Sequence, residues 1–152
     1  MRISARADYA VRASAELAAR DDETPIAAEE IARHQGIPHR FLEGILSDLR
    51  RGGIVASQRG SRGGHRLARE AAAITLADVI RAVDGPLVYV RDERPSDLEF
   101  EGVAAPLLHV WVALRANVRA VLESVTLDDL ARGDLPEGIR ALTDADDAWS
   151  QD

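Results

Sequence analysis

Arginine and glycine are concentrated in one short stretch of the sequence, residues 50–69. The stretch holds six arginines and no acidic residue, and its centre reads RGSRGG at residues 59–64. Guanidinium groups bind phosphate oxygens strongly, and glycine lets the backbone approach a bound group closely. Three interpretations follow: a flexible linker, a loop that binds the phosphates of a nucleotide, or a tip that reaches into DNA.

The residues on either side of this run decide between the three interpretations. Residues 54–59 predict a short strand, and residues 65–67 predict a second strand that returns beside it. A linker would not be flanked by strands. The run contains no Lys and precedes a strand instead of a helix, which disfavours a nucleotide-binding loop. The sequence therefore predicts a β-hairpin with arginines at its tip.

Three helices are predicted before this hairpin. Residues 4–20 have apolar side chains at helical spacing, with Ser4 as the N-cap. Residues 25–36 predict a helix of about two turns that Gly36 ends in a left-handed conformation. Pro38 suits the first position of a third helix, in which Phe41, Leu42, Ile45, Leu46 and Leu49 form the apolar face. This order is typical of a winged helix-turn-helix, so we expect a mainly α fold with a small β-hairpin wing.

The outward positions of the third helix and the hairpin tip carry groups that can recognise DNA. Arg40 can bind guanine or phosphate, Glu43 can accept a hydrogen bond from cytosine, and His39 can bond to either. Arg59 and Arg62 at the tip are suited to a narrow minor groove. The residues that we expect to contact DNA are His39, Arg40, Glu43, Gly44, Ser47, Arg50, Ser57, Arg59, Gly60, Ser61, Arg62 and Gly63.

The second half of the chain predicts a long helix. Residues 74–85 first predict a shorter helix that packs under the wing, with a Thr75/Asp78 capping box. The charged residues 91–102 have no period and predict a loop. Residues 103–125 then show a coiled-coil-like seam, whose simplest partner is the same helix of a second subunit. We expect dimerisation through Leu107, Trp111, Leu114, Val118, Val121, Leu122 and Val125.

Composition excludes several classes of function. The chain has no cysteine, which removes disulfides, thiol catalysis and thiolate-bound metals. No pattern of a catalytic nucleophile is present, and no two of the four histidines have metal-ligand spacing, so we expect neither an enzyme nor a bound metal or cofactor. Residues 1–70 contain 12 Arg and 10 acidic residues, whereas residues 71–152 contain 7 Arg and 16 acidic residues. With no signal peptide or membrane-spanning run, we expect a cytoplasmic protein whose first half meets DNA.

The assembled pattern resembles the Rrf2 family of winged-helix transcription regulators, the IscR, NsrR and CymR type. This resemblance implies a homodimeric regulator, by analogy a repressor, that binds an imperfect palindrome of double-stranded DNA and contacts bases through Glu43 and Arg59. It covers about residues 1–132. It is carried by Asp8-Tyr9-Ala10, Ile31-Ala32, the run from Ile37 to Leu42, Ile45-Leu46, the run from Leu49 to Val55, the run from Arg59 to Ala68, and the run from Ile74 to Ile80.

The sequence also departs from this family pattern. Members that sense iron–sulfur clusters hold them through three cysteines in the loop before the long helix, and residues 91–105 contain none. Asp8 matches an oxygen ligand of some members, but one carboxylate cannot hold a cluster, and the spacing of His109 does not match. We therefore predict no cluster. The sequence does not show whether the regulator responds to a small molecule, to a partner protein or to no signal. The alternative function is a winged-helix module that binds protein instead of DNA.

The expected organisation has four parts. Residues 1–86 form the winged helix-turn-helix domain, and residues 87–102 form a sensor-region loop without cysteines. Residues 103–132 supply the dimerisation helix and a short helix that begins with a second capping box at Thr126. Residues 133–152 are acidic and predict a flexible tail, part of which Ile139, Leu142 and Trp149 could dock.

Overall fold

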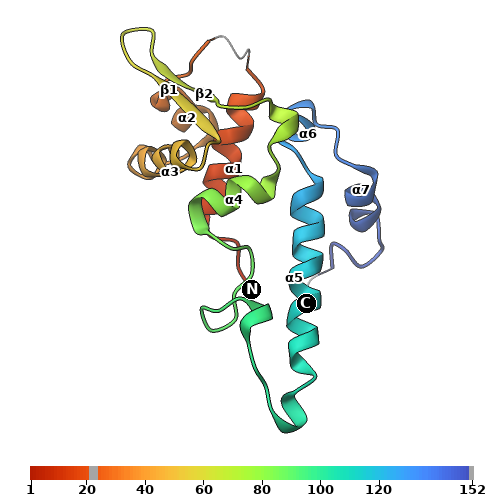
Figure 1. Ribbon diagram of the computed structural model, residues 1–152. Coiled ribbons are helices and arrows are strands. Elements are labelled where there is room, and N and C mark those ends of the chain that lie inside the picture. The colour runs from red at the N-terminus through yellow and green to blue at the C-terminus, as the bar shows by residue number, and fades with distance from the viewer. Residues whose placement is uncertain (21–23, 151–152) are drawn as a thin grey trace.

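The computed structural model describes residues 1–20 and 24–150 and consists mainly of α-helices with one two-stranded hairpin (Figure 1). This agrees with the predicted fold class. The elements are α1 (Ala5–Ala18), α2 (Ala28–Gln35), α3 (His39–Arg51), β1 (Val55–Gln58), β2 (Gly64–Leu67), α4 (Leu76–Asp84), α5 (Leu107–Ser124), α6 (Leu127–Arg132), α7 (Glu137–Thr143) and three short 3-10 turns, η1 (Ala71–Ala73), η2 (Pro95–Asp97) and η3 (Gly102–Ala104).

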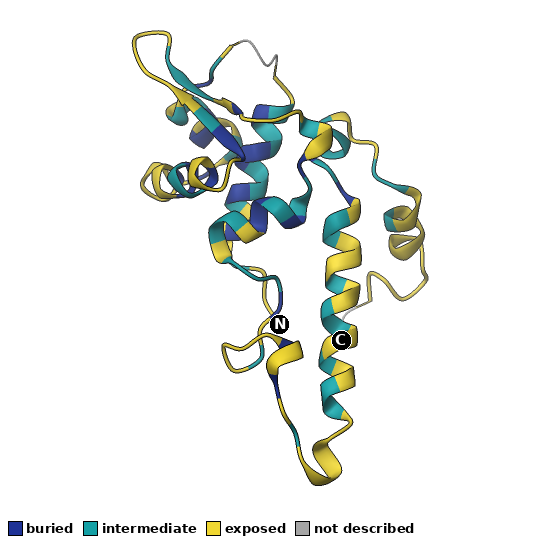
Figure 2. Cartoon of the chain, viewed as in Figure 1, coloured by how far each residue is buried: buried dark blue, intermediate teal, exposed yellow. Residues whose placement is uncertain are grey.

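Helix α1 lies at the centre of the core, in contact with α2, α3, α4 and α6. Ser4 is its N-cap, as predicted, because the Ser4 side chain accepts a hydrogen bond from the backbone N–H of Ala7. Its buried positions include Ala7, Ala10 and Ala13, whose small side chains let the neighbouring helices approach closely. Figure 2 shows that the buried residues gather around α1, whereas α5 is largely exposed.

Helices α2 and α3 form the helix-turn-helix. Gly36 ends α2 with a φ of 62°, the left-handed conformation predicted for it. Helix α3 begins one residue later than predicted, because Pro38 has an extended ψ of 124° and serves as the N-cap. Leu42, Ile45, Leu46 and Leu49 are buried as predicted, but Phe41 is 47% exposed. The prediction for Phe41 was therefore wrong in placing it fully on the apolar face.

The hairpin is joined to the start of α2. Strands β1 and β2 are antiparallel, with Val55 opposite Leu67 and Gln58 opposite Gly64. His65 extends the pairing, because its backbone N–H and C=O bond to Ile26 at 2.7 and 2.8 Å. Gly64 is required at this junction, since a Cβ there would lie 2.5 Å from the carbonyl oxygen of Ile26. The hairpin is thus fixed to the helix-turn-helix.

Helix α4 packs on α1 and α3, and not under the wing as predicted. The predicted capping boxes of α4 and α6 are both present, formed by Thr75 with Asp78 and by Thr126 with Asp129. The two helix starts are also paired, because Leu76 N–H donates to the carbonyl oxygen of Val125 at 2.9 Å. Val125 is buried at this junction and follows the end of α5, so it cannot meet a partner subunit as predicted.

The segment between α4 and α5 is more ordered than the predicted loop. Residues 90 and 93 pair across a tight turn, and η2 packs against α5. Pro95 and Leu98 are buried, which anchors the segment although its other residues are mostly charged and exposed. Helix α5 begins at Leu107, four residues later than predicted, after the separate turn η3 and Pro106. The few buried apolar residues of this segment do not recur with a helix or strand period, so the sequence predicted only a loop.

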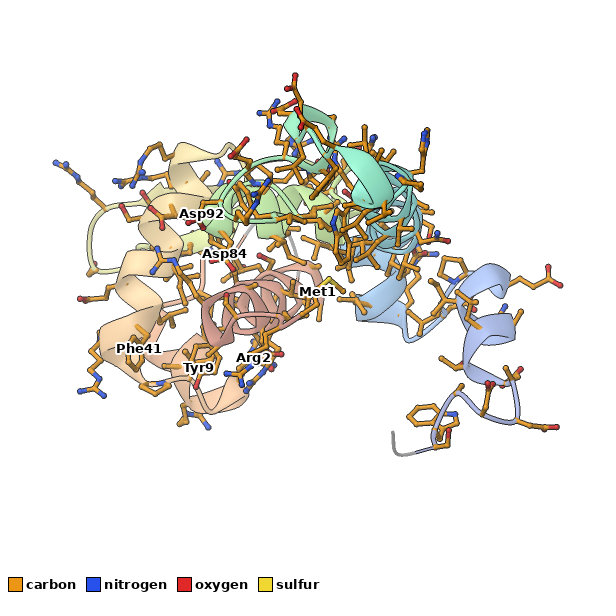
Figure 3. All side chains as sticks on the ribbon, turned by 90° about the horizontal axis from the view of Figure 1, so that it is seen from below. Met1, Arg2, Tyr9, Phe41, Asp84 and Asp92 are labelled. Carbon is orange, nitrogen blue, oxygen red and sulfur yellow. The ribbon has the colours of Figure 1, made fainter. Side chains whose placement is uncertain are left out.

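The acidic tail contains a helix, α7, that was not predicted. Helix α7 lies on the side of α5 that faces away from α3 (Figures 1 and 3). Ile139 is half-buried, but Leu142 and Trp149 are 60% and 81% exposed and do not dock the tail. In the part of the chain that the structure describes, no helix is both long and apolar enough to span a membrane.

Candidate nucleic-acid interface

The outward face of α3 presents the predicted polar side chains. His39, Arg40, Glu43 and Gly44 are exposed, whereas Ser47 is half-buried. His39 lies 3.9 Å from the Glu43 carboxylate, one turn further along the helix, and 3.4 Å from the carboxylate of Glu29 on α2. These groups form an exposed set of one imidazole, one guanidinium and two carboxylates that can bond to base edges and phosphates.

The orientation of α3 is fixed against α1 at two places. The rings of Tyr9 and Phe41 face each other with centroids 6.5 Å apart (Figure 3). Arg6 of α1 forms an ion pair with Asp48 near the end of α3. The guanidinium of Arg40 lies over the Phe41 ring, 4.7 Å from its centroid. The Phe41 ring therefore contacts Tyr9 of α1 and also the guanidinium of Arg40. Because Phe41 makes both contacts at the surface of α3, its side chain is only partly buried.

The tip of the hairpin consists of residues 59–63. Arg59, Gly60, Ser61 and Arg62 are exposed, and the turn closes with a hydrogen bond from Gly63 N–H to the carbonyl oxygen of Gly60. A Cβ on Gly63 would lie 2.2 Å from the carbonyl oxygen of Gln58, so a side chain cannot fit there. Glycine is thus needed for the turn itself, and the two arginines extend freely from it.

The end of α3 meets the hairpin directly. The Nη1 atom of Arg50 donates to Ser57 Oγ at 3.4 Å, which joins two of the predicted contact residues. Beside this contact is an open cavity of about 280 Å³, lined by Ala28, Glu43, Leu46, Ser47, Arg50 and His65. Helix α3 and the hairpin lie on the same side of the molecule, opposite α5 (Figure 1). The structure therefore brings both groups of predicted residues to one side.

His65 is a residue of this surface that sequence reasoning did not single out. Its ring is half-buried, and Nδ1 has no hydrogen-bond partner within the described residues. Burial lowers the pKa of the His65 imidazole, the positive charge of Arg50 lowers it further, and Glu29 opposes the shift. The place of His65 depends on the pairing with Ile26, which no local pattern reveals.

A metal site is not formed by the residues of this surface or by others that the structure describes. Residues 1–20 and 24–150 contain no group of three or more His, Cys, Asp or Glu side chains that could hold a metal ion. His34 is held by Glu16, whose carboxylate lies 2.7 Å from Nδ1, and His109 is an exposed residue at the start of α5.

Comparison with known proteins shows which family this chain resembles in sequence. The Rrf2 family model, described as an iron-dependent transcriptional regulator, matches residues 3–133. The Mycobacterium tuberculosis protein Rv1287, assigned as an HTH-type transcriptional regulator, is 48% identical over 144 residues, which cover 95% of this chain and 89% of the relative. The HTH-type transcriptional regulator CymR of Bacillus subtilis is 37% identical over 134 residues, which cover 86% of this chain and 90% of CymR.

Solved structures agree with these sequence relatives. The structure of CymR, the global cysteine regulator of B. subtilis, superposes with a TM-score of 0.74 at 36% identity and covers 88% of this chain and 98% of CymR. The structure of IscR from T. potens gives a TM-score of 0.68 at 30% identity, covering 100% of this chain and 93% of IscR.

Proposed function

The chain belongs to the Rrf2 family of HTH-type transcriptional regulators, and from this premise we propose that it binds operator DNA as a homodimer and represses transcription. Helix α3 enters the major groove with Glu43 directed at base edges, and Arg59 at the tip of the hairpin enters the adjacent minor groove. Arg50, Arg51 and Arg66 neutralise flanking phosphates. The other predicted contact residues also lie on α3 and in the hairpin.

The contact between Arg50 and Ser57 carries this proposal. It connects the end of α3 with the first strand of the hairpin, and α3 also packs against β1, so the two DNA-contacting elements are already in contact before DNA arrives. A preformed arrangement of this kind reduces the entropy lost on binding. The six arginines of positions 50–69, a stretch with no acidic residue, lie at the end of α3 and in and beside the hairpin.

We propose that this regulator works without an iron–sulfur cluster. The family model carries an iron-dependent description, but the sequence has no cysteine to supply thiolate ligands. The donor groups of the described residues do not gather into a set of three. Asp8, the candidate oxygen ligand, instead accepts a hydrogen bond from Arg12 at 3.0 Å. Iron-reconstituted protein should be colourless, and a charge-transfer band with stoichiometric iron and sulfide would contradict this part of the proposal.

Dimerisation through α5 is supported by the surface of that helix. None of its residues is fully buried in one chain, and Val110 is 56% exposed. The stripe of Val110, Leu114, Asn117 and Val121 has the 4-3-4 spacing of a coiled-coil seam. It shares the exposed Val121 and the half-buried Leu114 with the predicted seam. The other helix residues of that seam, Leu107, Trp111, Val118 and Leu122, are also half-buried within their own chain.

Selection of genomic DNA fragments by the purified full-length protein tests the proposed function. We expect enrichment of fragments that share an imperfect palindrome, with half-sites about one helical turn apart, and protection of both half-sites from cleavage. The genes beside the enriched sites would also indicate the signal. The absence of any enriched sequence would overturn the proposal. Binding to a protein partner that does not weaken with salt would favour the alternative, a winged helix that docks on protein.

A further inference from the structure

Three arginines from different elements line one cavity outside the DNA-facing surface. The cavity has a volume of about 340 Å³ and is lined by Arg81, Gly85, Pro86, Arg94 and Arg115. All of the titratable side chains in this lining are guanidinium groups. Three guanidinium groups without a carboxylate in the lining are suited to an anion and not to a cation.

The fold holds the three arginines in place from three directions. Arg81 lies in the last turn of α4, and Arg115 lies near the middle of α5, which packs against α4. Arg94 precedes η2, and η2 also packs against α5 with Pro95 buried at its start. Figure 1 shows the segment between α4 and α5 running alongside α5. The cavity is therefore a junction of α4, this segment and α5.

The positive charges in this cavity are only partly compensated. Arg81 pairs with Glu123 at 2.5 Å, but Glu123 is shared with Arg119, whose Nε lies 3.1 Å from the same oxygen. Among residues 1–20 and 24–150, no carboxylate forms an ion pair with Arg94 or Arg115. Gathering like charges is unfavourable unless an opposite charge lies between them. A bound anion would reduce the repulsion between these arginines, and no carboxylate of the described residues pairs with Arg94 or Arg115.

We propose that this cavity binds the phosphate or sulfate group of a small molecule, or the free ion, through Arg81, Arg94 and Arg115. A doubly charged tetrahedral oxyanion has enough acceptor oxygens to bond to three guanidinium groups at once, and arginine can bind two of these oxygens side by side. Because the ligand would contact α4, the segment before α5 and α5 together, it would connect the DNA-binding domain with the long helix. This site is separate from the proposed DNA-contacting residues.

Isothermal titration calorimetry of the full chain with inorganic phosphate in low-salt buffer tests this site. We expect one phosphate bound per chain, and binding at least about tenfold weaker in the Arg94→Gln/Arg115→Gln double variant, because two charge-assisted contacts are lost. Arg132→Gln is the matched control, since it removes one exposed arginine of α6 that pairs only with Asp128. This control should bind phosphate like the wild type. If the double variant does not fold, Arg94→Gln alone replaces it, because that side chain is exposed.

Parallel titrations with glycerol 3-phosphate distinguish the source of the anion. Tighter binding of glycerol 3-phosphate would identify a phosphorylated small molecule, whereas tighter binding of inorganic phosphate would identify the free ion, and both results support the site. Equal phosphate binding by the wild type and the double variant would overturn the proposal. It would also be overturned if the wild type bound neither ligand. Sedimentation of the double variant as a monomer would in that case show that the arginines contact a second subunit. No DNA is present, so the outcome is independent of the proposed function.

Discussion

Gly44 faces outward in the middle of α3, where glycine weakens a helix relative to alanine. Packing does not require glycine there, because an added Cβ would meet only Arg6 Nη1 at an ordinary contact distance of 3.9 Å. A position on this face that has no side chain lets another molecule approach the backbone of α3. We therefore relate Gly44 to DNA binding and not to folding.

Gly44→Ala should separate these two roles. The free energy of unfolding should rise by about 0.5–1 kcal/mol, as for other glycines in helices, while the affinity for operator DNA falls. Urea unfolding and fluorescence anisotropy with the selected operator measure the two effects. Gly138→Ala in α7 is the control, because an added Cβ there would meet nothing within 4 Å and α7 lies away from α3. Stabilisation without loss of DNA affinity would show that α3 does not approach DNA at this position.

His65 makes the stability of the folded protein depend on pH. The imidazole is half-buried beside Arg50, so its pKa in the folded protein lies below the ordinary value of 6.5. The unfolded chain therefore takes up a proton at a higher pH than the folded chain does. It follows that the contribution of His65 to stability is unfavourable below pH 6.5 and disappears as the pH rises above it.

His65→Gln removes this titration. As the pH falls from about 7.5 to about 5.5, the free energy of unfolding of the wild type should decrease more than that of His65→Gln. Urea unfolding at both values isolates His65, because all other titrating groups are common to both proteins. Equal losses of stability in the two proteins would contradict the burial of this ring.

At the residue scale, the sequence indicated the polar groups of α3 and of the hairpin tip, including the half-buried Ser47, but not His65. Arg59 and Arg62 could be placed because glycines mark the tip of a hairpin. His65 could not, because its surroundings come from Ile26 and Arg50, which are distant in sequence. The same limit applies to the three arginines of the anion cavity, which lie on elements separated by up to 34 positions between Arg81 and Arg115.

Helix α5 shows how far the pattern of one helix predicts its packing. Its apolar positions cover more than one stripe, and the sequence alone favoured the stripe through Trp111 and Val118. That stripe is half-buried because α4 and η2 of the same chain pack on α5. The exposed stripe with Val110 and Val121 remains for a second subunit. The stripe that we propose as the interface is therefore rotated around the helix from the predicted seam, because the packing of η2 on α5 could not be predicted from an aperiodic segment.

Val110→Glu should convert the protein from dimer to monomer. Val110 is exposed in one chain, so the substitution leaves the fold intact but places a charge in the apolar contact between subunits. Sedimentation velocity measures the mass, and operator affinity should fall with it because half-sites are no longer bound together. Ala116→Glu, about 120° around the helix, serves as the control. A dimer that persists in Val110→Glu would exclude this stripe as the interface.

The residues that begin and end the helices were the features best predicted from the sequence. Ser4, Gly36 and the pairs Thr75/Asp78 and Thr126/Asp129 act as predicted, because a cap is formed by residues within one turn of each other. Helix α7 was missed because it is short and lies in a strongly acidic segment. Packing of α4 on α1 and α3 was missed for a different reason: the apolar face of α4 could be predicted, but not which elements, distant in sequence, it contacts.

For the whole molecule, charge is divided between the two halves of the chain. Residues 1–70 have 12 Arg and 10 acidic residues, and residues 71–152 have 7 Arg and 16 acidic residues. The six arginines of residues 50–69 lie at the end of α3 and in and beside the hairpin, and Figure 1 shows α3 and the hairpin on the side of the molecule opposite α5. A net charge of −7 is thus compatible with the proposed DNA binding, because the excess of acidic residues belongs to the second half of the chain and not to residues 50–69.

The affinity of Arg59→Ala for the selected operator, measured by fluorescence anisotropy over a range of salt concentrations, tests the central claim most directly. Arg140→Ala on α7 is the matched control. We predict that wild-type binding weakens steeply with salt, that Arg59→Ala loses about 1–3 kcal/mol of binding free energy, and that Arg140→Ala binds like the wild type. Equal affinity of Arg59→Ala and the wild type, or binding insensitive to salt, would contradict DNA recognition through α3 and the hairpin.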